Sequence, residues 1–229
     1  MGAPVGPTGC NAPASAEAET PEAASSPIRG LQVAAGYGRF WSHLKFKDGT
    51  RPTLSEQSVV GQLGYFFTPA LSLTATGGGI LSGEMTEDGL NLDVGTGFVV
   101  SLQVVWQFLT EKGARPFMSA SFTASFSRAS FEDRAIERNG HIWGTDARFG
   151  LTVGYTFFNW WRIYLSPRVF GGPVFIDDGD TRLQGSDRYF VQAGMGMGFL
   201  LPKGITLYVD GSPAGEQSIS AGIAAFFPI

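Results

Sequence analysis

Few residues of this sequence carry groups able to do chemistry. His141 in "ERNGHIW" follows Ser130, Asp133 and Glu137, so one segment holds a hydroxyl, a base and carboxylates. That set can support nucleophilic catalysis, in which a base activates the hydroxyl. His43 stands far away in the chain, and His141 lies two residues from a tryptophan, a context more typical of a membrane interface. We therefore expect a protein that is not an enzyme, with hydrolysis kept as an alternative.

A second set consists of charges set within apolar stretches: Asp93, Asp146, Arg148, Arg168 and Asp210. Their mixed signs allow two kinds of chemistry. They can pair with one another as buried ion pairs, since buried charges must be compensated. Alternatively they form a charged constriction that filters or binds a polar solute.

Other chemistries find little support. Cys10 is the only cysteine, and with only two histidines no metal site is expected. "TATGGG" at 74–79 lacks the Gly-Lys-Ser/Thr that a phosphate-binding loop needs, so no nucleotide or other cofactor is expected. The net charge of −4, without a basic stripe, argues against a nucleic-acid partner.

The composition of the chain and the periodicity of its apolar residues predict the elements that position these charges. Charged residues make up 16% of the chain, below the roughly 25% usual in soluble domains. No run of about 18 apolar residues indicates a membrane helix. Instead, in "DVGTGFVVSLQVVWQF" at 93–108 every second residue, from Val94 and Phe98 to Trp106, is mostly apolar, while the other phase is mostly small or polar. A period of two predicts a strand, here an unusually long one.

The same alternation recurs along the chain. Clear copies lie at 118–126, 147–157, 189–199 and 219–227, and weaker ones at 31–37, 59–67, 71–81, 163–169 and 205–209. The sequence therefore predicts ten strands, and an even number is expected for a single-chain bacterial barrel.

Two all-β folds compete, a soluble sandwich and a membrane barrel. A sandwich needs many Lys and Glu on its water-facing phase. Here Lys45, Lys47, Lys112 and Lys203 all fall in predicted turns or loops, and every strand charge lies on the non-apolar phase. A lipid-facing Arg or Lys at mid-bilayer costs roughly 2 to 4 kcal/mol. We predict a closed antiparallel transmembrane up-and-down β-barrel over residues 29–229, because an open edge in lipid leaves backbone groups unpaired.

Connection lengths predict the orientation. Short links at 67–71, 109–115, 158–161 and 201–204 alternate with longer ones at 42–55, 83–90, 128–142, 172–188 and 211–217. Short turns are periplasmic and longer loops extracellular in such barrels, so both termini are predicted in the periplasm. The predicted periplasmic aromatic girdle comprises Tyr65, Phe67, Trp106, Phe108, Tyr155, Phe157, Trp160, Trp161 and Phe227. The opposite girdle is predicted from Phe40, Trp41, Trp143, Phe175 and Tyr189.

With this pattern the chain resembles the small single-chain outer-membrane β-barrel proteins of Gram-negative bacteria. The last strand, "SAGIAAFF", is similar to the C-terminal signal of those proteins, although Ala225 replaces an aromatic residue and Pro228-Ile229 extend past the usual terminal Phe. The resemblance implies recognition of this strand by the barrel-assembly machinery, contact with outer-membrane lipid and lipopolysaccharide, and a monomer.

The predicted lumen carries small and uncharged groups, with the five strand charges gathered in its extracellular half. The lining is predicted from Gly95, Gly97, Ser101, Gln103, Ser121, Thr123, Gly154, Gln192, Gly194 and Gly196. Small side chains leave space for a narrow water-filled pore for small polar solutes, whereas a closed structural barrel is the other interpretation. A third possibility is adhesion through the charged outer loops.

Residues 1–28 are predicted to be a residual signal-peptide or processing region and a disordered periplasmic tail. They are rich in Ala, Pro and Ser, and Ala14-Ser15-Ala16 fits a signal-peptidase site. Thr8-Gly9-Cys10 is a weaker match to a lipoprotein site, because Pro7 replaces the usual Leu.

Overall fold

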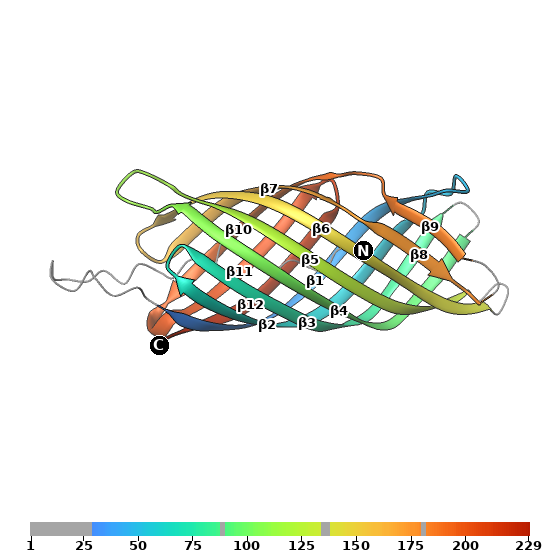
Figure 1. The fold of residues 1–229 in the computed structure, drawn as a ribbon, viewed down its shortest axis with the longest axis horizontal. Helices are drawn as coiled ribbons and strands as arrows, with labels where there is room; N and C mark the ends of the chain where they lie inside the picture. The colour runs from blue at the N-terminus through green and yellow to red at the C-terminus, as the bar shows by residue number, and fades with distance from the viewer. Residues whose placement is uncertain (1–28, 88–89, 134–137, 180–181) are drawn as a thin grey trace.

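The computed structural model describes residues 29–87, 90–133, 138–179 and 182–229, so the predicted tail at 1–28 lies outside the described residues. The described chain is all-β (Figure 1). Its strands are β1 (Gly30–Phe46), β2 (Thr53–Thr68), β3 (Leu71–Glu87), β4 (Leu90–Leu109), β5 (Phe117–Asp133), β6 (Arg138–Phe157), β7 (Trp161–Gly171), β8 (Pro173–Asp177), β9 (Arg182–Asp187), β10 (Val191–Leu201), β11 (Ile205–Ala214) and β12 (Gln217–Pro228). One 3₁₀ turn at Pro202–Gly204 joins β10 to β11, and no helix in the described residues is long and apolar enough to span a membrane.

The sheet closes on itself through its first and last long strands. β12 pairs antiparallel with β1 from Gly30 opposite Pro228 to Trp41 opposite Gln217. The other neighbours in the ring are consecutive except where β7 pairs with β10. Ten strands, namely all but β8 and β9, therefore form a closed barrel, which confirms the predicted fold class. Closure pairs the edges that lipid could not solvate.

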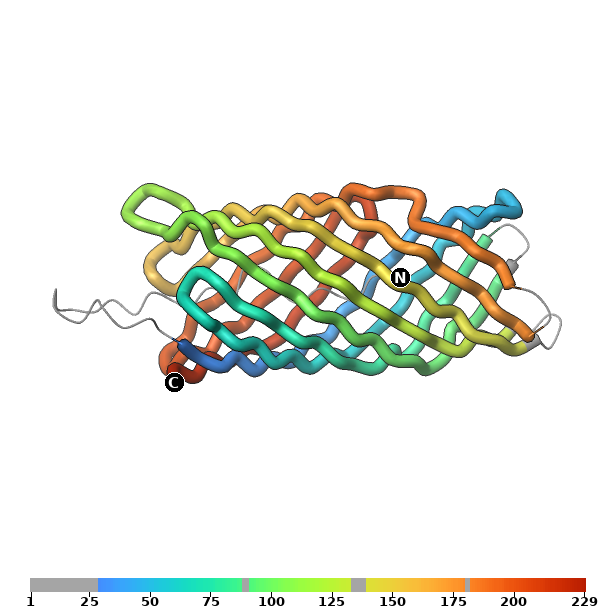
Figure 2. The backbone as a smooth tube through the Cα atoms, in the orientation of Figure 1, coloured from blue at the N-terminus to red at the C-terminus, as the bar shows by residue number. Residues whose placement is uncertain are grey.

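Strands β8 and β9 form a hairpin inside the segment 172–188, which was predicted to be a loop. β8 pairs with β6 at 141–144, beyond the point where β7 ends, and β9 pairs with the last residues of β1. At this end β8 and β9 occupy the place that β7, β10, β11 and β12 hold further down the barrel (Figures 1 and 2). The ten-strand barrel thus narrows to an eight-strand collar, which we call the distal collar. The opposite end, where the amide of Ile229 donates to the carbonyl of Arg29, is called the terminal end.

The other predicted long loops are also shorter than expected. β1 continues through Lys45 to Phe46, and β3, β4, β5 and β6 extend to within a few residues of their hairpin tips. The sequence understated these strands because their apolar residues change phase in the collar, so the alternation did not continue in register.

The outward face of the ten-strand part is apolar. Leu63 on β2, Leu102 on β4, Phe122 on β5 and Leu165 on β7 each expose about half or more of their surface, from 50 to 57%. The inward phase of the same strands carries Gly, Ser, Thr and Gln. This inside-out arrangement is stable only where the surroundings are hydrocarbon, so this part of the barrel is a membrane-spanning belt.

In the distal collar the two faces exchange character. Inward side chains form one apolar cluster, which we call the collar core: Leu44, Phe46, Leu54, Ile80, Met85, Leu92, Val94, Ala129, Phe131, Ile142, Val174 and Ile176, with Leu183 packed against it. Leu44, Leu54, Met85, Ile142 and Val174 have no exposed surface. The outward phase there is mainly polar, as with His43 and Lys45, apart from the stacked rings of Trp143 and Phe175. The collar is therefore built as a water-soluble barrel, with a hydrophobic interior and a polar exterior.

The aromatic residues predicted for the periplasmic girdle lie at the terminal end. Phe67, Trp106, Phe108, Trp160 and Phe227 expose 43 to 56% of their surfaces on the outward side. Tyr65 packs on Phe67, Trp106 on Phe108, and Phe157 lies against both Tyr155 and Trp161. In the opposite girdle Phe40 was assigned wrongly, because its side chain faces inward and is 3% exposed.

Candidate functional site

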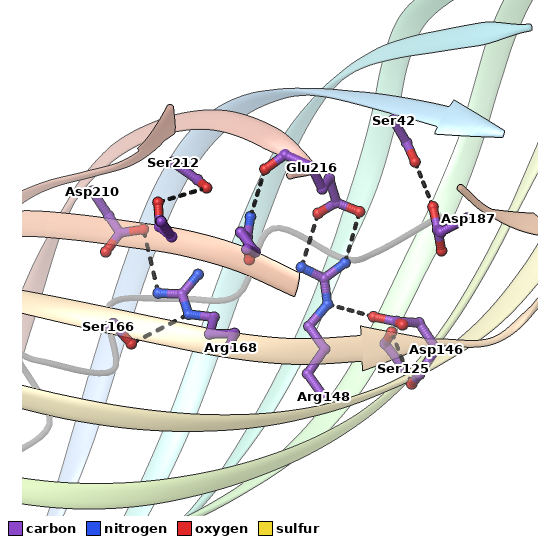
Figure 3. Close-up of polar contacts among 12 residues, drawn as sticks. Ser42, Ser125, Asp146, Arg148, Ser166, Arg168, Asp187, Asp210, Ser212 and Glu216 are labelled. Atoms are coloured by element: carbon purple, nitrogen blue, oxygen red, sulfur yellow. Dashed lines mark hydrogen bonds and ion pairs between the residues drawn. The ribbon is translucent and has the colours of Figure 1, made fainter. Parts of the chain in front are cut away.

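A buried ion-pair group lies inside the barrel on β6 and the β11–β12 turn (Figure 3). Asp146 and Arg148 are alternate inward residues of β6, and the Arg148 Nε donates to Asp146 Oδ2. The same guanidinium meets Glu216 twice, with Nη1 to Oε1 at 2.8 Å and Nη2 to Oε2 at 3.0 Å. All three residues are 3 to 4% exposed. One arginine therefore neutralises two carboxylates. Its two contacts with Glu216 are fork-shaped, the geometry in which guanidinium binds carboxylate most strongly.

A second group lies on β7 and β11. Arg168 Nη2 is 3.5 Å from Asp210 Oδ1, and the Arg168 Nε donates to Ser166 Oγ at 3.3 Å. The Tyr164 hydroxyl donates to Asp210 Oδ2 at 2.9 Å. Between the two groups, the side-chain amide of Gln192 donates to the Glu216 carbonyl at 2.9 Å. The interior charges are thus cross-linked through neighbouring strands.

Four of the five predicted charges, Asp146, Arg148, Arg168 and Asp210, lie in the interior as predicted. Asp93 was placed there wrongly. A bulge between Val94 and Gly97 in the β4–β5 pairing reverses the phase of β4, so that Leu92 and Val94 point inward. Asp93 instead lies on the outer face of the collar, in register with Glu84 and Glu132.

The predicted lining residues are mostly where the alternation placed them. Gln103 donates to Thr123 at 3.1 Å, and both are buried together with Ser121 and Gln192. Ser101, Gly97, Gly154, Gly194 and Gly196 share the inward phase of their strands. At Gly154 and Gly196 a side chain would collide with the inward rings of Phe117 and Tyr164, so these glycines let aromatic rings lie flat on the wall. Gly95 is the exception, because the bulge turns it to the outer face beside Ser130.

Several interior residues were missed because they fall in or next to segments predicted as loops. They are Glu216, Asp187, which accepts from the Ser42 hydroxyl, and Glu56 on β2. A continued search for period two through 42–56 would have found the inward set Ser42, Leu44, Leu54 and Glu56, which alternates with polar residues. The buried interior then holds five carboxylates (Glu56, Asp146, Asp187, Asp210, Glu216) and three guanidiniums (Arg148, Arg162, Arg168) among the described residues.

Glu56 stands out because it is 1% exposed and neither of its carboxylate oxygens has a hydrogen-bond partner. Its inward neighbours on adjoining strands are Phe40 and Gly83. A buried charge without a partner destabilises a fold, and an amide carries no charge, so Glu56→Gln is expected to raise the free energy of unfolding by about 1 to 3 kcal/mol. Urea titration of the protein in lipid vesicles measures this. Glu216→Gln, which removes a paired carboxylate, serves as the contrasting variant and should destabilise. A Glu56→Gln protein less stable than wild type would contradict the assignment.

The charged interior ends directly at the collar core. On β1 the inward residue after Ser42 is Leu44, and on β2 the one before Glu56 is Leu54. Apolar residues of β1 to β6 and β8 meet in one cluster across the barrel at this level. In an eight-strand barrel the interior is just wide enough for its own side chains to fill. The collar core is therefore an apolar layer between the charged interior and the distal end.

Comparison with known proteins gives similarity of architecture only. No protein-family model and no curated protein sequence matches the chain. Among solved structures it is similar to the outer membrane protease OmpT from Escherichia coli, with 12% identity, 91% of this chain and 99% of that chain covered, and a TM-score of 0.48. The translocator domain of autotransporter NalP from Neisseria meningitidis gives 10% identity, coverage of 91% and 90%, and a TM-score of 0.48. The COG4313 outer membrane channel from Pseudomonas putida F1 gives 10% identity, coverage of 92% of this chain and 100% of that chain, and a TM-score of 0.42.

These identities carry no activity from one protein to another. The assignment rests instead on the closed ring, the apolar outward belt and the polar inward phase of the chain itself. Together they give the chain the architecture of a bacterial outer-membrane β-barrel protein.

Proposed function

We propose that the protein is a closed, structural outer-membrane barrel that does not conduct solutes at rest. In this proposal both termini are periplasmic and the distal collar stands outside the cell. The observation that carries it is the collar core, in which side chains from seven strands pack together and none exposes more than 7% of its surface. An ion or polar solute crossing that layer would lose its hydration without gaining hydrogen bonds, at a cost of several kcal/mol.

The interior charges support a structural role for the same reason. Arg148, Arg168 and their carboxylate partners are 3 to 4% exposed and bound to one another. Charges that select solutes in a pore have to exchange partners with water and the solute. Here the fork-shaped Arg148–Glu216 pair joins β6 to the β11–β12 turn, and the single Arg168–Asp210 contact joins β7 to β11.

We further propose a role without catalysis. His141 lies on the outer face of β6, with Ser130 and Asp177 as its Cα partners on the two neighbouring strands. The Ser130 hydroxyl donates to the Thr96 carbonyl, and Asp177 accepts from the amide of Gly179. Both groups are thus engaged away from the histidine. The side chains of Asp133 and Glu137, part of the hydrolysis alternative, lie outside the described residues.

The test is single-channel recording in planar lipid bilayers. We expect wild-type protein, refolded to its heat-modifiable form, to give no current steps above those of bare lipid. A porin inserted in the same bilayers shows that open channels are detected. Reproducible ohmic steps from wild-type protein would overturn the proposal and favour the narrow pore.

A further inference from the structure

The outward residues of β1 form a basic ladder in the distal part of the barrel. From the belt outward they are Arg39, Trp41, His43 and Lys45, each two residues from the next, and Lys47 follows in the turn after the strand. Alternate residues of a strand point to the same face, so these side chains form one row along the barrel axis. None of them is a carboxylate.

Strand β9 continues this surface on the other side of β1. Lys45 is in register with Ser186, and the Lys47 amide donates to the Gln184 carbonyl at 3.1 Å. Arg182 begins β9, and Arg188 follows it directly, with its amide bonded to the His43 carbonyl. We call the set Arg39, Trp41, His43, Lys45, Lys47, Arg182, Gln184, Ser186 and Arg188 the basic strip.

The basic strip is hollowed at its distal end. A cavity of about 390 Å³ lies over Lys45, Lys47, Gln184 and Ser186, and Phe46, Gly185 and Pro173 complete its lining. Lys47 Nζ donates to Gln184 Oε1 at 2.5 Å, while Lys45 has no ion-pair partner among the described residues. The lining offers ammonium, amide and hydroxyl donors and no carboxylate. Such a donor set suits phosphate or carboxylate groups.

The arginines of the basic strip are held in place by aromatic rings. The Arg39 guanidinium lies 4.9 Å from the centre of the Trp41 ring, and that of Arg188 lies 5.5 Å from Tyr189. Arg182 stacks over both Trp143 and Phe175, at 4.9 and 4.6 Å. Stacking leaves the edges of the exposed Arg182 and Arg188 guanidiniums, where their N–H groups are, available to an anion. The Arg39 Nη2 instead donates to Ser55 Oγ at 3.3 Å. These four rings are the distal girdle that the sequence predicted, without the inward-facing Phe40. The arginines therefore stand at the membrane boundary.

Outward charge is unevenly distributed around the collar, although Asp48 lies in the turn after Lys47 and Arg128 is exposed on β5. The acidic residues Glu84, Asp93 and Glu132 form a row across β3, β4 and β5. Strand β2, between the two sides, has the uncharged and half-buried Thr53 and Gln57 in its outward phase. On β8 the one outward carboxylate of the strand, Asp177, is in register with Arg182. The excess of cations on β1 and β9 favours an anionic partner on that side.

We propose that the basic strip binds lipopolysaccharide, through the phosphate and acidic-sugar groups of its lipid-proximal region. The inference rests on the proposed orientation, in which the collar faces outward. The strip begins at the interfacial Arg39 and Trp41 and rises along the barrel axis to Lys47. Lipopolysaccharide is anchored beside the barrel in the outer leaflet, and its anionic sugars extend away from the membrane in the same direction as the strip. A soluble anion has no fixed orientation and would not require binding groups arranged along this axis. Binding of lipopolysaccharide at the basic strip does not require the barrel to conduct.

The test is binding of purified deep-rough lipopolysaccharide to the full-length protein in phospholipid nanodiscs, measured by thermophoresis. For K45Q/K47Q/R182Q we expect affinity to fall on the order of a hundredfold, because each basic side chain near an anionic surface contributes a factor of about five. The matched control K112Q/R115Q/K203Q removes three exposed cations from the terminal end and should bind within about twofold of wild type. Heat-modifiable migration of each variant verifies that the barrel is folded.

Three outcomes would overturn the inference. One is a basic-strip variant that keeps wild-type affinity, and another is a control variant that loses as much, which would indicate net charge alone. The third is wild-type binding of a soluble anionic polysaccharide, heparin, as tight as that of lipopolysaccharide. The orientation is tested separately by labelling Asp48→Cys, in a Cys10→Ser background, with a membrane-impermeant thiol reagent on intact cells. Neither the affinity measurement nor the thiol labelling depends on conductance. A negative result for lipopolysaccharide binding would therefore not contradict the closed-barrel proposal, which the bilayer recordings test separately.

Discussion

Replacing the β8–β9 hairpin, residues 173–187, with a short Gly-Ser linker is expected to turn a silent barrel into one that passes ions. The hairpin supplies Val174 and Ile176 to the collar core, together with Leu183 packed against it. It also bridges β6 to β1, the only contacts that close the collar on that side among the described residues. Without it, water reaches the polar interior around Glu56 and Asp146. Planar-bilayer recordings should change from no resolved steps to stepwise current.

A less drastic pair of variants separates the apolar layer from the hairpin as a whole. Val174→Ser with Ile176→Ser places hydroxyls in the collar core, whereas Phe175→Ser alters the residue between them, which faces outward against Trp143. We expect current from the first and silence from the second. A folded hairpin-deletion variant that stays silent would mean that the collar core is not the barrier.

Arg148→Met is expected to lower the free energy of unfolding by about 3 to 5 kcal/mol, because it leaves two buried carboxylates without their cation. Asp146 and Glu216 have no other ion-pair partner in the described part of the chain, and both are 3 to 4% exposed. Urea titration in lipid vesicles, followed by tryptophan fluorescence, measures the change. Arg168→Met should cost less, since its contact with Asp210 is longer at 3.5 Å and Tyr164 also donates to that carboxylate.

The matched rescue is the triple variant R148M/D146N/E216Q, which removes the carboxylate charges together with the cation. Its stability should return most of the way to that of wild type, because replacing a buried ion-pair group by neutral side chains is often close to neutral. A triple variant as unstable as R148M alone would show that Arg148 acts through packing, for instance against the Phe170 ring 5.0 Å away.

The membrane-spanning belt was predictable from the sequence. Hydrocarbon outside a closed barrel forces every second residue to be apolar, and Leu102, Phe122 and Leu165 report that constraint without any tertiary information. The inward position of Arg148, Arg168 and Asp210 follows from the same rule, as does the girdle around Trp106 and Trp160. Periodicity also accounts for the ten strands that close the ring.

Features that depend on local register or long-range contacts were decided by the tertiary structure. The bulge after Val94 moves Asp93 to the outer face, and one extra residue in a strand exchanges its two faces wherever it occurs. Outside the bilayer the rule for the outward face reverses, so the collar strands, with Leu44 and Leu54 inward, resembled loops in the sequence. The pairing of Arg148 with Glu216, 68 residues away, exists only once β12 closes the ring. The alternation of apolar and polar residues thus determined whether each belt residue faces lipid or the barrel interior. Closure of the barrel decided which interior charges form ion pairs, and it brought together the side chains of the collar core that fill the distal end.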